Sequence, residues 1–186
     1  MHLLKDQKSL LRNELRRRLA SLTAGDRVRR SDGIRKKLFQ HPRFSSARSV
    51  FTYFSVPTEV ETRSIVEEGL KKGKRMYVPR VDWAQKRIQA IEVHSLIELQ
   101  PGAYGIAEPP LDEKKVGRPE DLDLVIVPGL GFDLRGARLG RGEGYFDRFL
   151  KQARRAYKIG LAFECQIVAE IPRDVTDERV DEILVG

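Results

Sequence analysis

The stretch LGRGEGYFDRFL (residues 139–150) combines closely spaced glycines with charged side chains, which suits it to binding phosphate. The glycines occupy alternate positions: Gly140, Gly142 and Gly144. Glycine lets the backbone approach a ligand closely, and successive N–H groups can then turn toward an anion. Arg138 and Arg141 can add charge-assisted hydrogen bonds to the same anion. Asp147, one turn into the helix expected after the loop, has the carboxylate oxygens that Mg²⁺ prefers.

The alternative is that these glycines only make tight turns, and the number of glycines does not decide between the two interpretations. The loop lacks the GxxxxGK[ST] pattern of a P-loop, and GxGxG matches the dinucleotide-binding fingerprint only in part. Its position favours phosphate, because it follows the most apolar segment (121–133), whose apolar run ends at Pro128. Ligands of open α/β sheets bind beyond the carboxyl ends of the strands.

A second set of charges lies in the amino-terminal segment, which is expected to form a helix. Its apolar residues recur on one face at the helical period: Leu4, Leu11, Leu15 and Leu22. On a neighbouring face, Lys8, Arg12 and Arg16 follow one another at i+4 and form a cationic stripe. Judged from the residues alone, a solvated surface is the favoured interpretation of this stripe.

Alternating strands and helices must position these charged groups. The sequence predicts a second helix, from a capping box at Thr23 and Asp26 to about Phe39. A strand at 49–55, a helix at 60–74 and strands at 75–79 and 86–93 follow. After a loop rich in glycine and proline at 101–110 come a buried strand at 121–133, a helix from about 144 to 153, a strand at 158–164 and a short final strand. The β-α-β order favours parallel pairing. We therefore predict a single three-layer α/β/α domain over residues 1–186, with a largely parallel central sheet.

The composition is that of a globular protein of the cell interior. The chain has 186 residues, of which 40% are hydrophobic, so it is long enough to bury a sizeable core. Its single cysteine, Cys165, excludes an internal disulfide and favours a reducing compartment. No apolar run approaches the roughly 20 residues that span a bilayer, and the amino terminus lacks the apolar core of a signal peptide. We expect a cytoplasmic, monomeric protein without a membrane partner.

The formal net charge of +8 indicates an anionic partner or a highly charged surface of the thermophile type. Nucleic acid is one candidate, since Lys and Arg release counterions from phosphate. A polyanionic small molecule drawn into a positive cleft is another. The charged fraction of 33% is also typical of thermophile surfaces. Composition does not choose among these, but no helix-turn-helix, RNP or zinc-finger pattern is present, so no nucleic-acid partner is expected.

The longer run PGLGFDLRGARLGRGEGYFD (128–147) resembles the signature of the 5-formyltetrahydrofolate cyclo-ligase family, also called 5,10-methenyltetrahydrofolate synthetases. Five further segments fall in the family's order and spacing: KSLLR, YFSVPTEVET, KGKRMYVPRV, AYGIAEP and VDEIL. The resemblance therefore covers nearly the whole chain, and the long glycine-rich pattern is far more specific than a short glycine motif.

The resemblance implies an ATP- and Mg²⁺-dependent enzyme that converts 5-formyltetrahydrofolate to 5,10-methenyltetrahydrofolate and releases ADP and phosphate. In the family's reaction, the γ-phosphate of ATP is transferred to the formyl oxygen, and N10 then closes the ring. Phosphoryl transfer needs positioning and charge neutralisation more than a covalent nucleophile. A further hypothesis is that the basic surface binds a polyglutamate tail on the folate.

The resemblance also implies roles for individual residues. The ATP-binding set comprises Lys8, Arg12, Arg138, Leu139, Gly140, Arg141, Gly142, Glu143, Gly144, Tyr145 and Phe146. Arg141 is expected nearest to the transferred phosphate, as the catalytic residue. The folate-binding set comprises Phe54, Glu59, Tyr104, Arg141, Gly142, Gly144 and Tyr145. Asp147 and Asp181 correspond to the two magnesium carboxylates, provided that the final strand brings Asp181 to the same sheet edge.

Position 143 departs from the family pattern, in which Lys or a small residue is expected. An inward carboxylate there would repel phosphate, so we expect Glu143 to point outward, with a nearby arginine as candidate partner. Two other functions remain open. One is an isomerase or other ligand-binding activity on a similar α/β scaffold, because fold does not fix function. The other is a basic nucleic-acid-binding protein.

Overall fold

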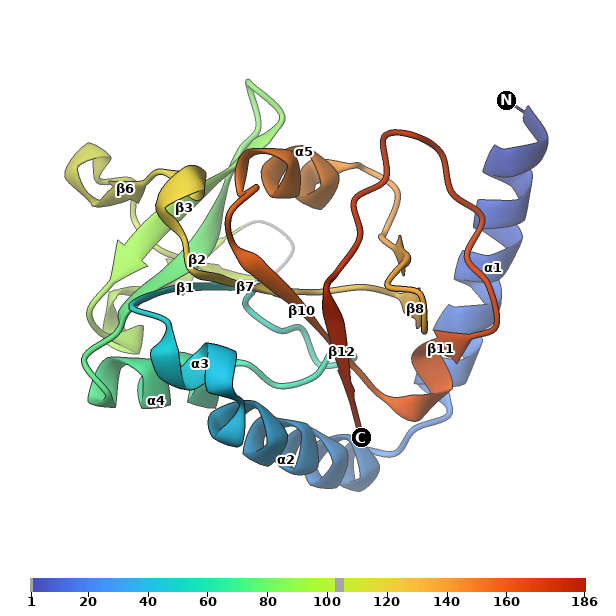
Figure 1. Cartoon of the computed structure of the whole chain (residues 1–186), viewed down its shortest axis with the longest axis horizontal. Helices are drawn as coiled ribbons and strands as arrows, with labels where there is room; N and C mark the ends of the chain where they lie inside the picture. Colours follow the sequence, from blue (N-terminus) through green and yellow to red (C-terminus); the bar gives the residue numbers. More distant parts are fainter. Residues whose placement is uncertain (1, 103–105) are drawn as a thin grey trace.

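The computed structural model describes residues 2–102 and 106–186, and its centre is a seven-stranded sheet in the order β12-β10-β7-β1-β2-β3-β6 (Figure 1). The strands are β1 (Ser49–Thr52), β2 (Arg75–Asp82), β3 (Arg87–Val93), β6 (Val116–Gly117), β7 (Leu124–Val127), β10 (Tyr157–Ala162) and β12 (Glu182–Val185). The five from β12 to β2 pair in parallel, and β3 pairs antiparallel with both β2 and β6. The predicted mixed α/β fold with a largely parallel sheet is confirmed.

Helices cover both faces of this sheet (Figure 1). The helices are α1 (His2–Ala20), α2 (Ala24–Gln40), α3 (Pro42–Ser46), α4 (Arg63–Lys71) and α5 (Tyr145–Gln152). In Figure 1, α2, α3 and α4 lie on one face and α5 on the other, while α1 stands beside the small sheet that contains β8 and β11. The predicted helices around residues 24–39 and 144–153 are therefore confirmed, as is the amino-terminal helix.

The strand pattern explains the two cores. Successive side chains of a strand point to opposite faces. Leu124 and Ile126 accordingly belong to the apolar cluster under α2 and α4, whereas Val125 and Val127 belong to the cluster that packs on α5. All four residues of β7 are buried, as expected for a central parallel strand.

Short strands and 3₁₀ turns surround the central sheet. A three-stranded sheet joins β11 (Ile167–Val168), β8 (Gly131–Asp133) and β9 (Arg138–Leu139), and a two-stranded sheet joins β4 (Gln100–Pro101) and β5 (Ala107–Glu108). Single 3₁₀ turns occur at Leu96–Glu98, Glu113–Lys115, Pro119–Asp121 and Glu164–Gln166. The segment predicted as one strand at 121–133 is thus two, because Pro128 cannot donate to a ladder.

The strand expected at 49–55 ends at Thr52, three residues early, and the cause is a loop held by side chains. The hydroxyl of Thr62 donates to the Tyr53 carbonyl (2.7 Å) and accepts from the Ser55 N–H (3.1 Å). The Tyr53 hydroxyl donates to the Val60 carbonyl at 3.0 Å. These bonds replace strand pairing, delay the next helix to Arg63, and fix the loop that carries Glu59.

Candidate active site

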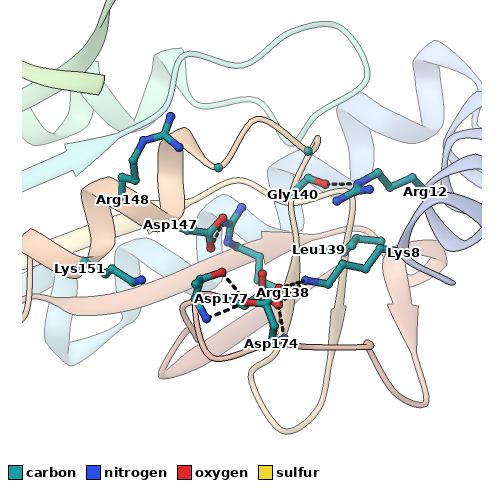
Figure 2. A pocket seen from close by; sticks show the side chains of 13 residues that line it. Lys8, Arg12, Arg138, Leu139, Gly140, Asp147, Arg148, Lys151, Asp174 and Asp177 are labelled. Carbon is teal, nitrogen blue, oxygen red and sulfur yellow. Dashed lines mark hydrogen bonds and ion pairs between the residues drawn. The ribbon is translucent and has the colours of Figure 1, made fainter. Parts of the chain in front are cut away.

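A pocket of about 440 Å³ lies where the glycine-rich loop meets α1, the first turns of α5 and the segment 174–177 (Figure 2). Its lining residues are Lys8, Arg12, Arg138, Leu139, Gly140, Gly142, Gly144, Asp147, Arg148, Lys151, Asp174, Thr176 and Asp177. Five of these side chains are cationic and three are carboxylates, so cations are in excess. The pocket therefore favours an anion, and it joins residues from both ends of the chain.

Two of the loop glycines adopt conformations that other residues rarely take. Gly142 has φ 120° and Gly144 has φ 67°, both in the left-handed region that favours glycine. Gly144 is also the N-cap of α5, so its turn directs the loop into the amino terminus of that helix. A side chain at Gly142 would lie 3.6 Å from the Arg12 guanidinium. The loop can follow this path beside α1 because these positions lack side chains.

The cationic stripe of α1 contributes two of its members to the pocket. Arg12 Nε donates to the Gly140 carbonyl at 2.9 Å, which ties α1 to the loop, and burial lowers the pKa of this guanidinium. Lys8 Nζ pairs with Asp177 Oδ2 and, at 3.2 Å, with Asp174 Oδ2; its side chain is only 11% exposed. The solvated-surface interpretation is therefore wrong for these two residues. Arg16 instead donates to Asn13 on its own helix.

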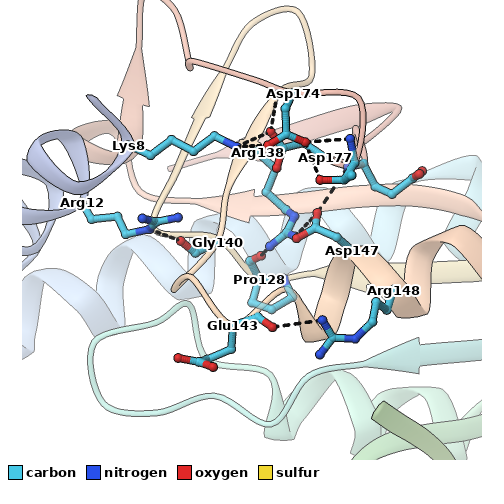
Figure 3. Close-up of polar contacts among 12 residues, drawn as sticks. Lys8, Arg12, Pro128, Arg138, Gly140, Glu143, Asp147, Arg148, Asp174 and Asp177 are labelled. Atoms are coloured by element: carbon cyan, nitrogen blue, oxygen red, sulfur yellow. Dashed lines mark hydrogen bonds and ion pairs between the residues drawn. The ribbon is translucent and has the colours of Figure 1, made fainter. Parts of the chain in front are cut away.

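Arg138 and Asp147 form a pair at the back of the pocket (Figure 3). Arg138 Nη2 donates to Asp147 Oδ1 at 2.7 Å and Nη1 donates to the Pro128 carbonyl at 3.2 Å. The Arg138 side chain is 3% exposed and that of Asp147 is 22% exposed. Asp147 Oδ1 also accepts from the Glu178 N–H at 3.2 Å. Both Nη groups of Arg138 therefore have protein partners, and the residue orients Asp147.

A second pocket, of about 610 Å³, lies between α2 and the loop of residues 53–62. Its lining residues are Ala24, Arg27, Val28, Ser31, Phe54, Ser55, Val56, Pro57, Glu59, Glu61, Arg63, Ile106 and Ala107. Arg141 lines neither pocket itself, but it lies between Gly140 and Gly142 of the first pocket, and its Nη2 lies 2.8 Å from Glu59 Oε1 of the second. The other oxygen of Glu59 accepts from the Val56 N–H at 3.1 Å. The structure thus brings Phe54, Glu59 and Arg141 together.

The side chains of Tyr145 and Phe146 pack against neighbours. Tyr145 meets the Trp83 ring edge-on at 6.1 Å between centroids, and Phe146 packs on Phe51 and Phe149 in the core. Leu139 is 1% exposed and belongs to the opposite apolar cluster. These residues position the loop, which leaves its backbone as the part that can reach a ligand.

Glu143 points away from the Arg138–Asp147 pair in Figure 3, as expected from the sequence. Its contact with Arg148 is through the backbone: Arg148 Nη1 donates to the Glu143 carbonyl at 3.2 Å. The candidate pairing of the Glu143 carboxylate with an arginine is not among the ion pairs of the described residues.

Among the predicted site residues that the structure describes, five are not in the lining of either pocket: Arg141, Glu143, Tyr145, Phe146 and Asp181. The carboxylate of Asp181 accepts from the Lys158 N–H at 2.8 Å, beside the start of β10, and Asp181 lines neither pocket. Its role as a metal ligand gains no support from this placement and stays a prediction. Tyr104 lies outside the described residues. Within 2–102 and 106–186, no group of three or more His, Cys, Asp or Glu side chains is arranged to hold a metal ion.

Five residues that line the first pocket are not predicted from the sequence: Arg148, Lys151, Asp174, Thr176 and Asp177. A signal existed for the first two, since positions 144, 148 and 151 share a helix face and follow the glycines directly. The segment 174–177 is polar and lacks periodicity, so the sequence gives no signal for it. Its position in the pocket follows from the fold, which brings this segment next to α1.

Comparison with known proteins decides the family. A family profile described as the 5-formyltetrahydrofolate cyclo-ligase family matches residues 4–186. The chain belongs to this family. A mouse protein named 5-formyltetrahydrofolate cyclo-ligase is 35% identical, over 94% of this chain and 91% of its own length. The protein of that name from Escherichia coli K12 is 29% identical, over 88% and 91%. The family resemblance inferred from the sequence, and with it the classification as a ligase, is confirmed.

Solved structures agree with this assignment. The NMR structure of Aquifex aeolicus 5,10-methenyltetrahydrofolate synthetase superposes with a TM-score of 0.84 at 36% identity, covering 96% of this chain and 89% of that one. A 5,10-methenyltetrahydrofolate synthetase from Mycoplasma pneumoniae gives 0.73 at 23% identity, over 95% and 97%, and at that identity the likeness concerns the fold alone. None of the helices in the described part of the chain is long and apolar enough to cross a membrane.

Proposed function

We propose that this protein converts 5-formyltetrahydrofolate to 5,10-methenyltetrahydrofolate, with ATP as cosubstrate and release of ADP and phosphate. The observation that carries the proposal is the Arg141–Glu59 pair, because Arg141 lies between two glycines that line the cationic pocket and Glu59 lines the more apolar one. ATP would occupy the first pocket and the folate the second. The γ-phosphate and the formyl group would then meet beside Arg141.

The chemistry requires such a meeting point. The N5-formyl group is an amide and a poor electrophile, so its oxygen must first become a leaving group. Transfer of the γ-phosphate to that oxygen releases ADP, and attack of N10 on the resulting iminium phosphate closes the ring. Phosphate then leaves with the former formyl oxygen. Arg141 would neutralise charge on the phosphoryl group during transfer, and the loop N–H groups would orient it.

Lys8 and Arg12 would contact the remaining phosphates from α1, with Arg148 and Lys151 opposite them on α5. Lys8 would exchange its carboxylate partners for phosphate oxygens. Glu59 would accept hydrogen bonds from the pterin N–H groups, and Phe54, which is 5% exposed, would provide an apolar wall. The substrate would thereby draw Glu59 away from Arg141 and free the guanidinium for the phosphate.

Asp147 fits a magnesium ion that is held mainly by nucleotide phosphates and water, as is usual for Mg²⁺. It lines the pocket, and its Oδ2 accepts no hydrogen bond from the described residues. Mg²⁺ there would neutralise charge on the phosphates of ATP. We further propose that the protein acts in the cytoplasm as a monomer, without a nucleic-acid or membrane partner; the single, partly buried Cys165 suits a reducing compartment.

The direct test mixes purified protein with 5-formyltetrahydrofolate and Mg²⁺, with and without ATP, and follows the absorbance of the methenyl product. We expect product only with ATP, and one ADP for each product molecule. Turnover without ATP would favour the isomerase alternative. Binding of DNA or RNA that weakens steeply with salt, without any turnover, would favour the nucleic-acid alternative.

A further inference from the structure

The second pocket contains two carboxylates that already have partners in the protein. Glu59 holds Arg141 and caps the Val56 N–H. Glu61 accepts from the Ser64 N–H at 3.2 Å and from its hydroxyl, and it lies 3.7 Å from Arg35. Neither carboxylate neutralises the arginines that line the same pocket.

Two lining arginines, Arg27 and Arg63, form no ion pair with the described residues. Arg27 uses one Nη group to donate to the Leu19 carbonyl at 3.1 Å, while its Nε is buried without a partner in the described part of the chain. Arg63 is exposed, and its guanidinium lies 4.8 Å from the centre of the Phe54 ring. A guanidinium has five N–H donors, so both side chains retain donors for an anion.

Most of the remaining pocket wall is apolar, with Ser31 and Ser55 as its polar members. Val28, Phe54, Val56, Pro57 and Ile106 all line it, and α2 and α4, which carry the two arginines, cover the same face of the sheet (Figure 1). A ligand that fits must therefore present an aromatic or apolar body together with carboxylates. The substrate of the proposed reaction has that chemistry, because a benzoyl group joins its pterin to a glutamate. The pterin would lie toward Glu59 and Arg141, where the formyl group must react.

We propose that Arg63 and Arg27 bind the glutamate carboxylates of the folate substrate, an inference that rests on the proposed function. Arg63 stacks on Phe54 and takes the outer carboxylate, since it is exposed and leaves space for a longer tail. Arg27 takes the carboxylate nearer the pocket wall through its remaining donors. Arginine suits this task because its planar group binds carboxylates in a bidentate manner.

The test compares two substrates: 5-formyltetrahydrofolate and the primary amide of 5-formyltetrahydropteroate, which lacks the glutamate and carries no carboxylate. For Arg63→Gln we expect KM for the complete substrate to rise about tenfold, the lower end of the loss of a charge-assisted hydrogen bond at an exposed site. KM for the truncated substrate and KM for ATP should stay at the wild-type values. Arg63→Lys should recover part of the loss because it keeps the charge.

Arg43→Gln is the matched control, since Arg43 also stacks on a ring (Tyr157, 4.6 Å) but lines neither pocket. It should leave both KM values unchanged. An equal rise of KM for both substrates in Arg63→Gln would mean that Arg63 only shapes the pocket, and no rise would mean that the tail lies elsewhere; each result overturns the proposal. If the wild-type protein turns over neither substrate, the proposed function fails instead.

Discussion

Replacement of Asp147 by alanine would leave Arg138 as a buried cation without its carboxylate. The Arg138 side chain is 3% exposed, so water can replace only in part the interaction with Asp147 Oδ1, which now lies 2.7 Å from Nη2. The Glu178 N–H loses the same acceptor. The remaining partner of Arg138 is the neutral Pro128 carbonyl, at 3.2 Å. The substitution should therefore reduce stability as well as activity.

The size of the effect follows from burial. Removal of one partner of a fully buried ion pair costs about 3–5 kcal/mol. Asp147 is 22% exposed, which lets some solvent reach the site, and we expect about 2–3 kcal/mol of unfolding free energy to be lost. For a chain of this size each kcal/mol lowers the thermal midpoint by about 2–4 °C, so the midpoint should fall by roughly 5–10 °C.

Thermal unfolding followed by circular dichroism measures this directly. Asp147→Asn separates the two roles, because its amide oxygen can still accept from Arg138 and the Glu178 N–H, whereas a neutral amide is a weaker magnesium ligand. It should lose less stability than Asp147→Ala while requiring more Mg²⁺ for turnover. Adding Arg138→Met to Asp147→Ala should restore part of the lost stability, since the uncompensated charge is removed. A wild-type midpoint for Asp147→Ala would refute the reasoning.

Three further predictions concern charged groups of the two pockets. Arg141→Ala should lower kcat at least about a thousandfold, as expected for an arginine on a transferred phosphoryl group. It should shift the thermal midpoint by no more than about 3 °C, because the Arg141 side chain is 57% exposed although that of Glu59 is only 16% exposed. Glu59→Gln should raise ATP hydrolysis without folate by up to about fivefold, the population shift that release of an ion pair with one exposed partner permits. Hydrogen bonds from the Thr176 hydroxyl and N–H, with Lys8 contributing less, lower the pKa of Asp174 to about 2. Thr176→Val should therefore raise that pKa toward its ordinary value in an NMR titration.

The outcomes that contradict these predictions differ. An active Arg141→Ala would remove Arg141 from phosphate transfer, and a large fall in its midpoint would assign it a structural role. Unchanged or slower ATP hydrolysis in Glu59→Gln would mean that Glu59 does not restrain Arg141. Because the pKa of Asp174 is depressed on folding, its stabilising contribution is complete above about pH 4 and is lost as the pH falls toward 2. Acid unfolding of Thr176→Val should begin at a higher pH, and an unchanged acid limb would contradict this.

What could be predicted from the sequence was local. The capping box at Thr23 and Asp26 closes within four residues and is present as expected. The parallel pairing of β1 with β2 follows from the β-α-β order, and Val50 lies beside Met76 as that order requires. The glycine-rich loop could also be predicted from the sequence, because the conformations of Gly142 and Gly144 depend on their own lack of a side chain.

The placement of Asp181 depends on pairing between distant segments. β12 pairs in parallel with β10, and Ile159 lies beside Glu182, so the residue just before β12 lies at the amino end of the strands. Ligand sites of such sheets form beyond the carboxyl ends. The prediction of a final parallel strand already implies this placement, because a residue just before a parallel strand lies at the amino end of the sheet. Asp147 lies at the opposite end, since it follows the loop that leaves the carboxyl end of β7.

The role of Lys8 also depends on residues that are distant in the sequence. Its helical spacing indicated a cationic stripe, but the choice between surface and site was made by Asp174 and Asp177, more than 160 residues away. Those carboxylates hold the ammonium group in the pocket, as Glu59 holds Arg141. ATP would therefore exchange one set of anionic partners for another at both cations. Such an exchange costs affinity but keeps the long side chains ordered in place, which favours positioning over tight binding, and positioning is what phosphoryl transfer requires.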